Sequence, residues 1–262
     1  MSQKPYTSLC FSGGGVCGVA YLGALKTLHR LGVVDWLTRE RPIQTFLGTS
    51  VGALFALLTY AKIDLFMPQA TQIIRDFLRL FQWNTDNLFT GARLGLGTGA
   101  RCIEFIEQLL YDRHGYRNIT LAQMHSLVGG DLVLVSSCVK TAKPIYFTHR
   151  THPFVSVSDA VFASMAIPFL FQPHRIRVRE EDVVFPFHAA YRPVLHCGQT
   201  FVHGNREYEV QTVDHETLKL RAAKYRIQHC VDGCFVCNNP FVLAPPGSRI
   251  LNLVLQKETS FE

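Results

Sequence analysis

A Gly-Thr-Ser-Val-Gly turn between a short apolar strand and an apolar helix constrains this fold more than any other feature of the chain. Residues 43–47 are predicted to form the strand, and the turn occupies residues 48–52. Residues 51–60 are apolar on every side, which is typical of a helix buried on all faces. A turn of this kind requires a close approach between strand and helix, and an α/β domain supplies one.

A second strand, glycine turn and helix lie at the start of the chain. Residues 6–11 are β-prone, and a helical stripe follows over residues 16–31 with Gly32 expected at its C-terminal end. The turn between them satisfies the pattern G-x-G-x-x-G and contains Gly13, Gly14, Gly15 and Gly18.

The rest of the chain continues this alternation until about residue 173 and resumes it near Asp232. We expect helices at residues 69–81 and 100–111, a glycine-rich loop at 93–99, and strands at 131–139, 144–148 and 249–255. The run at 131–139 is almost continuously apolar, as in a strand that is covered on both faces. The pattern predicts an α/β sheet with helices on both faces.

A β-rich segment at about residues 179–228 interrupts this pattern, and we interpret it as hairpins inserted into the α/β domain. It combines basic residues with aromatic ones, a mixture that suits a lipid interface. We therefore expect it to govern access to the substrate. The alternative is an ordinary β subdomain whose aromatic side chains form a small core of their own. The aromatic residues in question are Phe185, Phe187, Tyr191, Phe201 and Tyr208.

Composition excludes a disordered chain and favours a peripheral or soluble protein. Of the 262 residues, 48% are hydrophobic and 18% are charged. The formal net charge of +6 favours anionic surfaces such as phospholipid headgroups, but the basic residues are scattered and we expect no nucleic-acid partner. Residues 1–15 lack the apolar core of a secretory signal, and the run 51–61 is too short to span a bilayer. With eight cysteines, this indicates reduced thiols and a cytoplasmic location, with peripheral membrane contact.

The first glycine turn is compatible with three interpretations. Its backbone amides could hold the pyrophosphate of a dinucleotide at a helix N-terminus, with Asp35 as the acid that binds the ribose. The apolar run directly before Asp35 contains only Val33 and Val34, however, and is too short for the second strand of a dinucleotide fold. The same amides could stabilise an oxyanion in an acyl hydrolase. The third interpretation is a tight turn without a ligand.

Ser50 lies where a nucleophile elbow would expose its serine. Gly48 and Gly52 permit a sharp turn, and the hydroxyl stands at the N-terminus of the predicted helix. A nucleophilic serine needs a base. None of the eleven histidines has a revealing sequence context, whereas Asp232 precedes Gly233 and follows an apolar residue, so that a turn can hold its carboxylate at a strand end.

Four ordered blocks resemble the patatin-like phospholipase family. They span residues 11–18, 48–54 and 163–168, with a final block made of residues 232–233 and 238–240. The resemblance implies a three-layer α/β/α sandwich with a central, mostly parallel sheet. It also implies a phospholipase A type of lipid acyl hydrolase with no cofactor and no catalytic metal. The block at 163–168 would line the floor of the site.

The resemblance assigns a role to individual residues. Ser50 would attack the ester carbonyl, Asp232 would accept the serine proton, and the amides of Gly13, Gly14 and Gly15 would hold the oxyanion. The remaining motif glycines would support the turns, namely Gly18, Gly48, Gly52 and Gly233. The substrate would be a phospholipid or another lipid ester.

Two positions depart from the family pattern. Cys17 stands where the family usually has lysine or arginine, and Cys234 stands where a second glycine often follows the Asp-Gly pair. The loss of the basic residue favours an alternative, a catalytically weak protein of the same fold that binds lipid or acts as a scaffold. Cys230, Cys234 and Cys237 with His229 form a weak zinc signature, and small core thiols are the preferred interpretation.

Overall fold

The computed structural model describes residues 5–38, 42–67, 72, 75, 97–186, 196–203, 206–214, 216 and 219–255. Apart from residues 72 and 75, the helix expected at residues 69–81 lies outside these residues, as does most of the glycine-rich loop expected at 93–99. Phe187 and Tyr191 of the inserted segment lie outside them as well.

The chain divides into two compact units. One comprises Met1–His174 together with His229–Glu262, and the other comprises Arg175–Gln228. The second unit overlaps the interval expected for the insertion. That the whole chain forms one acyl hydrolase domain around this insertion stays a prediction.

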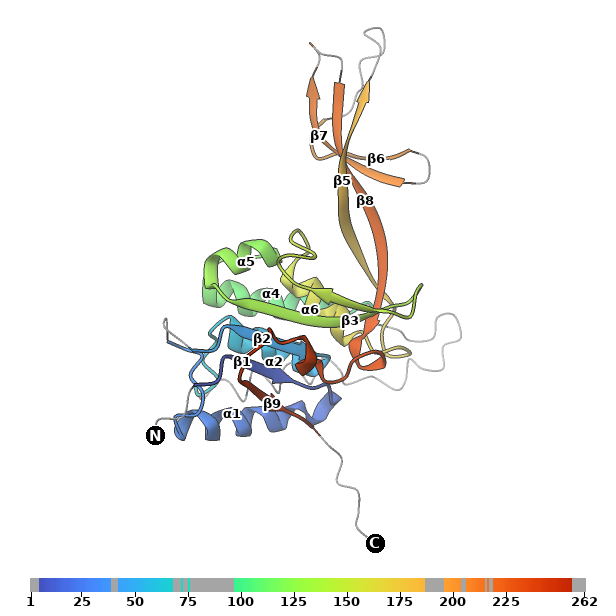
Figure 1. Cartoon of the computed structure of the whole chain (residues 1–262). Coiled ribbons are helices and arrows are strands. Elements are labelled where there is room, and N and C mark those ends of the chain that lie inside the picture. The colour runs from blue at the N-terminus through green and yellow to red at the C-terminus, as the bar shows by residue number, and fades with distance from the viewer. Residues whose placement is uncertain are drawn as a thin grey trace. The chain divides into compact units, whose positions relative to one another are not determined.

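The larger unit contains a mostly parallel sheet, as expected (Figure 1). Strands β1 (Ser8–Phe11), β2 (Thr45–Thr49), β3 (Asp131–Cys138) and β9 (Ile250–Leu253) follow the order β9-β1-β2-β3 and are parallel. Strand β4 (Pro144–Phe147) is antiparallel to β3. The last residues of β8 (Lys219–Asp232) also pair antiparallel with β3.

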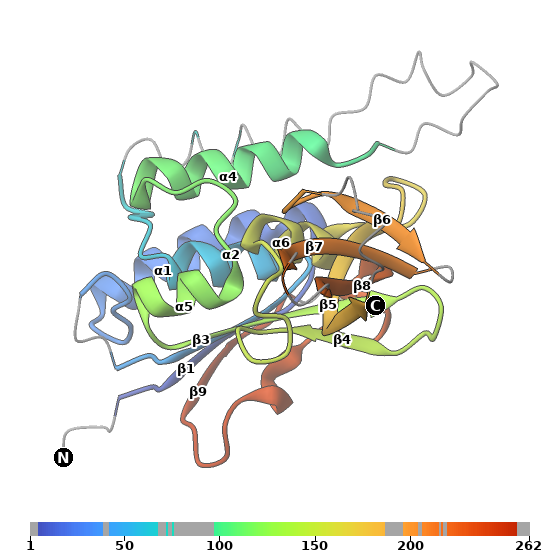
Figure 2. The same ribbon diagram turned by 90° about the horizontal axis from the view of Figure 1, so that it is seen from above.

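Helices cover one face of this sheet (Figure 2). Helix α1 (Ala20–Arg30) packs beside α2 (Val51–Tyr60), where the rings of Tyr21 and Phe55 meet edge to face at 5.3 Å. Helix α6 (Val157–Met165) contacts α2 and β3, and α4 (Ala100–His114) packs on α6. Helix α5 (Leu121–Val128) precedes β3. All ten residues of α2 are buried, which explains why its sequence is apolar on every side.

Short 3-10 helices lie against the opposite face of the sheet. Successive side chains of a strand point to opposite faces, so Cys10 and Thr49 point away from α2. The Cys10 thiol lies 3.5 Å from the Asn239 side chain, and the Thr49 hydroxyl donates to the Cys237 carbonyl over 2.9 Å. Both partners belong to the segment that contains η3 (Gly233–Phe235) and η4 (Pro240–Leu243). In the part of the chain that the structure describes, this segment forms the third layer.

The first helix starts later than its sequence pattern predicts. A 3-10 helix, η1 (Gly15–Val19), precedes α1, which then ends in the expected glycine cap. Gly32 has a φ of 67° and donates to the His29 carbonyl, while Val33 donates to the Leu28 carbonyl. These two bonds form a Schellman motif, which satisfies carbonyls at the end of the helix.

The second unit contains strands β5 (His174–Pro186), β6 (Thr200–His203), β7 (Arg206–Asp214) and most of β8, and hairpin pairings join β6 to β7 and β7 to β8. Phe185 packs on Tyr208 with ring centroids 5.0 Å apart, and Phe201 stacks on Tyr208 at 5.3 Å. These three aromatic side chains therefore form a cluster inside the unit. No helix in the described residues of the chain is long and apolar enough to cross a membrane.

Candidate active site

Strand β3 brings Ser50 and Asp232 together. Val135 pairs with Thr49, the last residue of β2, and the next residue, Ser136, pairs with Asp232, the last residue of β8. Because the two pairings occupy adjacent positions on one strand, the ends of β2 and β8 meet. The Ser50 hydroxyl donates a hydrogen bond to Asp232 Oδ2 over 2.6 Å, across 182 positions of sequence.

Ser50 has the backbone of a sharp elbow. Its φ is 56° and its ψ is −128°, and it is the residue that directly precedes α2. A non-glycine residue in such a region costs on the order of 1–3 kcal/mol and needs support from its surroundings. The residue is 3% exposed. The strain holds the hydroxyl at the start of the helix, as the turn sequence predicts.

Asp232 is buried, and each of its two carboxylate oxygens accepts a hydrogen bond. Oδ2 accepts from Ser50, and Oδ1 accepts from the Cys234 amide over 2.8 Å. Burial raises the pKa of Asp232 above its ordinary value of 3.8, although the hydrogen bonds from Ser50 and Cys234 oppose that rise. The carboxylate is thus a stronger base than a carboxylate in water.

Ser164 supports the elbow, a role that the sequence did not reveal. The Ser50 amide donates to the Ser164 hydroxyl over 2.9 Å, and that hydroxyl in turn donates to the Val135 carbonyl. In the same helix segment, the Ala166 carbonyl accepts from the Asp232 amide over 3.0 Å. The block at residues 163–168, expected to line the floor, therefore contacts the backbone of both Ser50 and Asp232. An Ala-Ser pair in an apolar helix carries no local signal for such a contact.

The three glycines expected to hold an oxyanion lie in two different environments. Gly13 is buried, and its amide donates to the Asn238 carbonyl over 2.9 Å. Gly14 and Gly15 are exposed, and within the described residues their amides have no acceptor. A Cβ on Gly13 would lie 3.3 Å from the Ser50 Cβ, so the turn passes directly beside the serine.

The remaining motif glycines permit close approach, three of them to another stretch of backbone and Gly18 to the Val51 side chain. A Cβ on Gly48 would lie 2.3 Å from the Gly52 carbonyl oxygen, and one on Gly52 would lie 2.4 Å from the Phe11 carbonyl oxygen. A Cβ on Gly233 would lie 2.2 Å from the Val135 carbonyl oxygen, and one on Gly18 would collide with Val51. These four glycines hold the strands and turns of the site at distances that no other residue allows.

The two unusual cysteines lie on the two turns of the site. Cys17 is exposed in η1, and its amide donates to the Gly14 carbonyl over 3.2 Å. The Cys234 sulfur would lie 2.2 Å from a Cβ on Gly13, so it fills the space beside that glycine. Burial of the thiol and the neighbouring Asp232 carboxylate raise the pKa of Cys234. Cys234 is therefore a thiol and not a thiolate at neutral pH.

The structure bears on two of the alternatives raised by the sequence. Asp35 Oδ1 accepts from the Leu37 amide over 2.9 Å in a turn. Residues 31–36, directly around it, form no strand, so the second strand of a dinucleotide fold is missing there. In the described part of the chain, the thiols of Cys230, Cys234 and Cys237 do not converge with His229 as metal ligands.

Comparison with known proteins identifies a family and several relatives of this chain. A family model described as patatin-like phospholipase matches residues 9–244. The probable lipid hydrolase 463L of Invertebrate iridescent virus 6 is 25% identical over 179 residues, which cover 66% of this chain and 57% of that protein. The triacylglycerol lipase SDP1L of Arabidopsis thaliana is 25% identical over 192 residues, which cover 71% of this chain and 22% of that protein.

Two solved structures show a weaker likeness. VipD from Legionella pneumophila aligns with a TM-score of 0.47 and 14% identity over 95% of this chain and 50% of that chain. The type III effector ExoU aligns with a TM-score of 0.44 and 18% identity over 64% of this chain and 42% of that chain.

The match to the family model covers both turns, the helix segment at residues 163–168 and the Asp-Gly pair. The chain spans only 57% and 56% of the two viral relatives that it resembles, the second being protein R571 of Acanthamoeba polyphaga mimivirus. Since the family model nevertheless covers residues 9–244 of 262, the chain belongs to the patatin-like phospholipase family.

Proposed function

We propose that this protein hydrolyses carboxylic ester bonds of phospholipids, as a phospholipase A, with Ser50 as nucleophile and Asp232 as general base. One observation carries the proposal: a buried serine hydroxyl, at a strained elbow, donates over 2.6 Å to a buried carboxylate. Serine is a poor nucleophile until a neighbouring base accepts its proton, and this contact supplies the base.

In the acylation step, the Ser50 oxygen bonds to the ester carbonyl carbon while its proton passes to Asp232 Oδ2. The tetrahedral intermediate then collapses, the bond to the alcohol oxygen breaks, and Asp232 returns the proton to that oxygen. In deacylation, Asp232 takes a proton from water, whose oxygen bonds to the acyl carbon. The bond between that carbon and the Ser50 oxygen then breaks, the fatty acid leaves, and Asp232 returns the proton to the Ser50 oxygen. The raised pKa of Asp232 suits both the acceptance and the return of the proton.

The negative charge of the intermediate needs donors that are not already in use. Gly14 and Gly15 offer exposed amides at the start of η1, beside the turn that passes Ser50. The Gly13 amide donates to Asn238, so its contribution would require that bond to open. We therefore assign the main part of the oxyanion hole to Gly14 and Gly15, with Gly13 allowing the close approach.

A lipid substrate is supported by apolar side chains on the segments that build the site. Val16 follows the oxyanion turn and is 69% exposed, and Phe235 follows Asp232 by three positions and is 67% exposed. Phe169, which follows Ala166 by three positions, is 91% exposed. Exposed apolar residues that gather on a surface mark an interaction site, and we expect these three to contact acyl chains and the surface of a membrane.

The test is a release assay over phospholipid, triacylglycerol and short-chain esters, with Ser50→Ala as the blank. Labelling with a fluorophosphonate probe provides the second measurement, since only an activated serine reacts. We expect acyl release from phospholipid and labelling that Ser50→Ala abolishes.

The alternative of a catalytically weak lipid-binding or scaffolding protein draws on Cys17, which stands where the family usually has a basic residue. That protein would bind vesicles yet release no acyl chain and resist the probe. This outcome would overturn the proposed hydrolase.

A further inference from the structure

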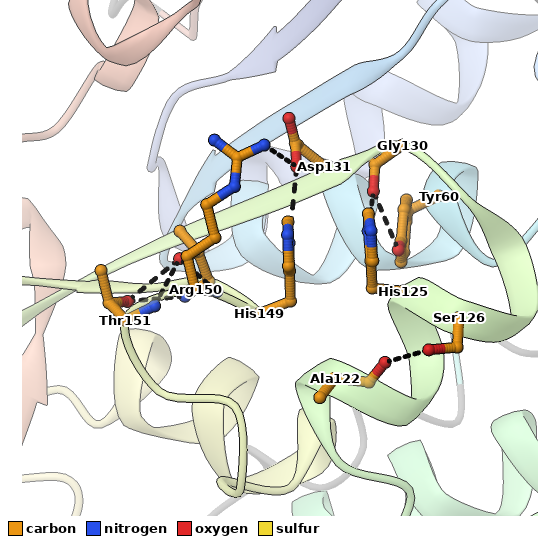
Figure 3. A network of polar contacts seen from close by, with 10 residues as sticks. Tyr60, Ala122, His125, Ser126, Gly130, Asp131, His149, Arg150 and Thr151 are labelled. Carbon is orange, nitrogen blue, oxygen red and sulfur yellow. Dashed lines mark hydrogen bonds and ion pairs between the residues drawn. The ribbon is translucent and has the colours of Figure 1, made fainter.

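His125, Asp131 and His149 converge at the end of β3 that lies away from Ser50 (Figure 3). His125 is in α5, Asp131 is the first residue of β3, and His149 follows β4. One potential ligand atom from each residue lies within 4.8 Å of those of the other two. No step of the proposed reaction uses any of these side chains.

The first argument for a ligand is an unsatisfied nitrogen. Nδ1 of His149 is buried and makes no hydrogen bond, and the whole side chain is only 15% exposed. A buried polar atom without a partner is uncommon and needs an explanation. This nitrogen lies 3.4 Å from Asp131 Oδ1. For metal–ligand bonds of about 2.1 Å, two ligands of a tetrahedral ion stand about 3.4 Å apart. The measured separation therefore fits two ligands of one ion.

The second argument is the tautomer of His125. Its Nδ1 lies 2.7 Å from the Gly130 carbonyl oxygen, which can only accept, so Nδ1 carries a proton. The lone pair is then on Nε2. A histidine that binds a metal through one nitrogen usually donates the other N–H to a carbonyl or carboxylate, and His125 has this arrangement. The Tyr60 hydroxyl also donates to the Gly130 carbonyl, over 3.3 Å, and helps to hold it.

The two histidine rings are stacked, with centroids 3.7 Å apart and planes at 6° to each other. The lone pairs of parallel rings run side by side, whereas ligands of one ion converge on it. Coordination must therefore turn the rings out of this stack. The turn after β4 is well held, because the Thr148 hydroxyl accepts from the amides of Arg150 and Thr151. We therefore expect the His125 ring to make most of the movement, by pivoting about its Nδ1 hydrogen bond to Gly130, which it keeps.

The charge of the cluster also favours a cation. Two neutral imidazoles and one carboxylate leave a net charge of −1. Arg150 opposes a bound cation, because its guanidinium lies 3.6 Å from the same carboxylate oxygen. The Arg150 side chain is 74% exposed, so it can swing into solvent when an ion binds.

We propose that His125, Asp131 and His149 form a structural site for a zinc-type divalent cation, with water completing the coordination. Two imidazoles beside one carboxylate suit Zn²⁺, whereas Ca²⁺ and Mg²⁺ take oxygen ligands and would not use the imidazoles. Asp131 precedes Val135 by four positions, which is about 13 Å along a strand at about 3.3 Å per residue. The ion therefore joins α5, β3 and the turn after β4 without touching the dyad.

The test is thermal unfolding of metal-free, untagged protein titrated with Zn²⁺. We expect the Tm to rise by several degrees at saturation and the shift to disappear in His149→Asn and Asp131→Asn. His229→Asn is the matched control, since His229 is exposed and belongs to no such cluster in the described residues. Arg150→Gln removes the opposing cation and should lower the Kd for Zn²⁺ several-fold.

Co²⁺ distinguishes this site from adventitious binding by the eight cysteines. Histidine and carboxylate ligands give visible d–d bands without the strong near-ultraviolet absorption of thiolate ligation. A thiolate spectrum, an unchanged Tm, or an equal shift in wild type and His149→Asn would overturn the proposal. If Asp131→Asn fails to fold, His125→Gln replaces it in the test. The Tm shift with Zn²⁺ and the Co²⁺ bands should both be lost in that variant, and their persistence would overturn the proposal.

Discussion

The backbone amide of Ser50 donates to the side-chain hydroxyl of Ser164, 114 positions away, over 2.9 Å. The Ser164 hydroxyl in turn donates to the carbonyl of Val135. Val135 pairs with Thr49, the last residue of β2. Helix α6 is thereby joined to the elbow and to the strand that aligns the dyad. The hydrogen bonds of Ser164 go to the Ser50 and Val135 backbone and not to the Asp232 carboxylate, so we regard it as a positioning residue.

Removal of this hydroxyl should slow the reaction without weakening substrate binding. A buried amide without an acceptor costs about 1–3 kcal/mol, and about 1.4 kcal/mol is tenfold in rate. We expect Ser164→Ala to lower kcat by about tenfold to a hundredfold and to leave KM within about twofold. Ser158→Ala is the control, because Ser158 is a buried serine of α6 that bonds to Glu107 instead. An equal fall of kcat in both variants would contradict a specific role for Ser164.

The sequence predicted what is encoded over a few neighbouring residues. The buried helix at residues 51–60, the Gly32 cap and the elbow at Ser50 each follow from a local pattern, and all three are present. The mostly parallel sheet followed from the alternation of such patterns. The 3-10 helix before α1 was missed, because five residues are too few to distinguish a period of about 3.0 residues from the roughly 3.6 of an α-helix.

Contacts between segments that are far apart in the sequence could not be predicted from it. The engagement of the Gly13 amide by Asn238, the role of Ser164 and the cluster of His125 with His149 all depend on register and on loop paths. No spacing rule links such positions. Asp232 was chosen from a family resemblance, and only the pairing of Ser136 with Asp232 explains why it reaches Ser50.

Asp232→Asn should stabilise the protein at neutral pH. Burial raises the pKa of Asp232 above 3.8 in the folded state, so the native protein holds a proton that the unfolded chain has lost. Stability therefore falls as the pH rises from about 3.8 through the folded pKa, and the ionised carboxylate costs stability above it. We expect a higher Tm for Asp232→Asn at pH 7 and a difference that vanishes below pH 3.8. A variant that is less stable across the whole pH range would refute this account.

The same pKa sets the acid limit of activity. Only ionised Asp232 can accept the serine proton, so kcat/KM should fall as the pH drops through the raised pKa. The fall should begin at a higher pH than an exposed aspartate would give. The measurement is a pH–rate profile with a soluble short-chain ester, and the control is the far-ultraviolet circular dichroism spectrum at each pH.

Turnover should not require calcium. Calcium prefers a cage of oxygen ligands, and the one cluster of three potential ligands in the described residues contains two histidines and lies away from Ser50. We expect an unchanged kcat in excess EGTA at a temperature well below the Tm. A large loss that calcium restores would exclude a mechanism based on the dyad and backbone amides alone.

The β-rich segment should affect access to lipid and leave the chemistry unchanged. The partners of Ser50 and Asp232 all belong to the larger unit, and β5 pairs with β8, so a short linker can replace residues 179–228. We expect kcat for soluble esters to stay within about twofold and turnover of vesicles to weaken. The packing of Phe185, Phe201 and Tyr208 argues for an independent small core, and unchanged vesicle turnover would favour that role. Equal loss on both substrates in folded protein would contradict both roles.

The dyad makes the sharpest prediction. Ser50→Ala and Asp232→Asn should each reduce turnover by several orders of magnitude, whereas no single histidine substitution should do so. In a triad the base is a histidine and the acid only orients it. Here the Ser50 hydroxyl donates directly to the carboxylate, and neither residue has a histidine partner in the described part of the chain.

Asp232→Asn separates the base from the shape of the site. Its amide can still fill the space and accept from the Cys234 backbone, but it cannot take the serine proton. We therefore expect a folded protein that binds lipid, resists the fluorophosphonate probe and has no measurable burst of product. Each of the eleven histidines, replaced in turn by glutamine, serves as a control. One histidine whose loss silences a folded enzyme as fully as Ser50→Ala would show that Asp232 orients a base and is not the base itself.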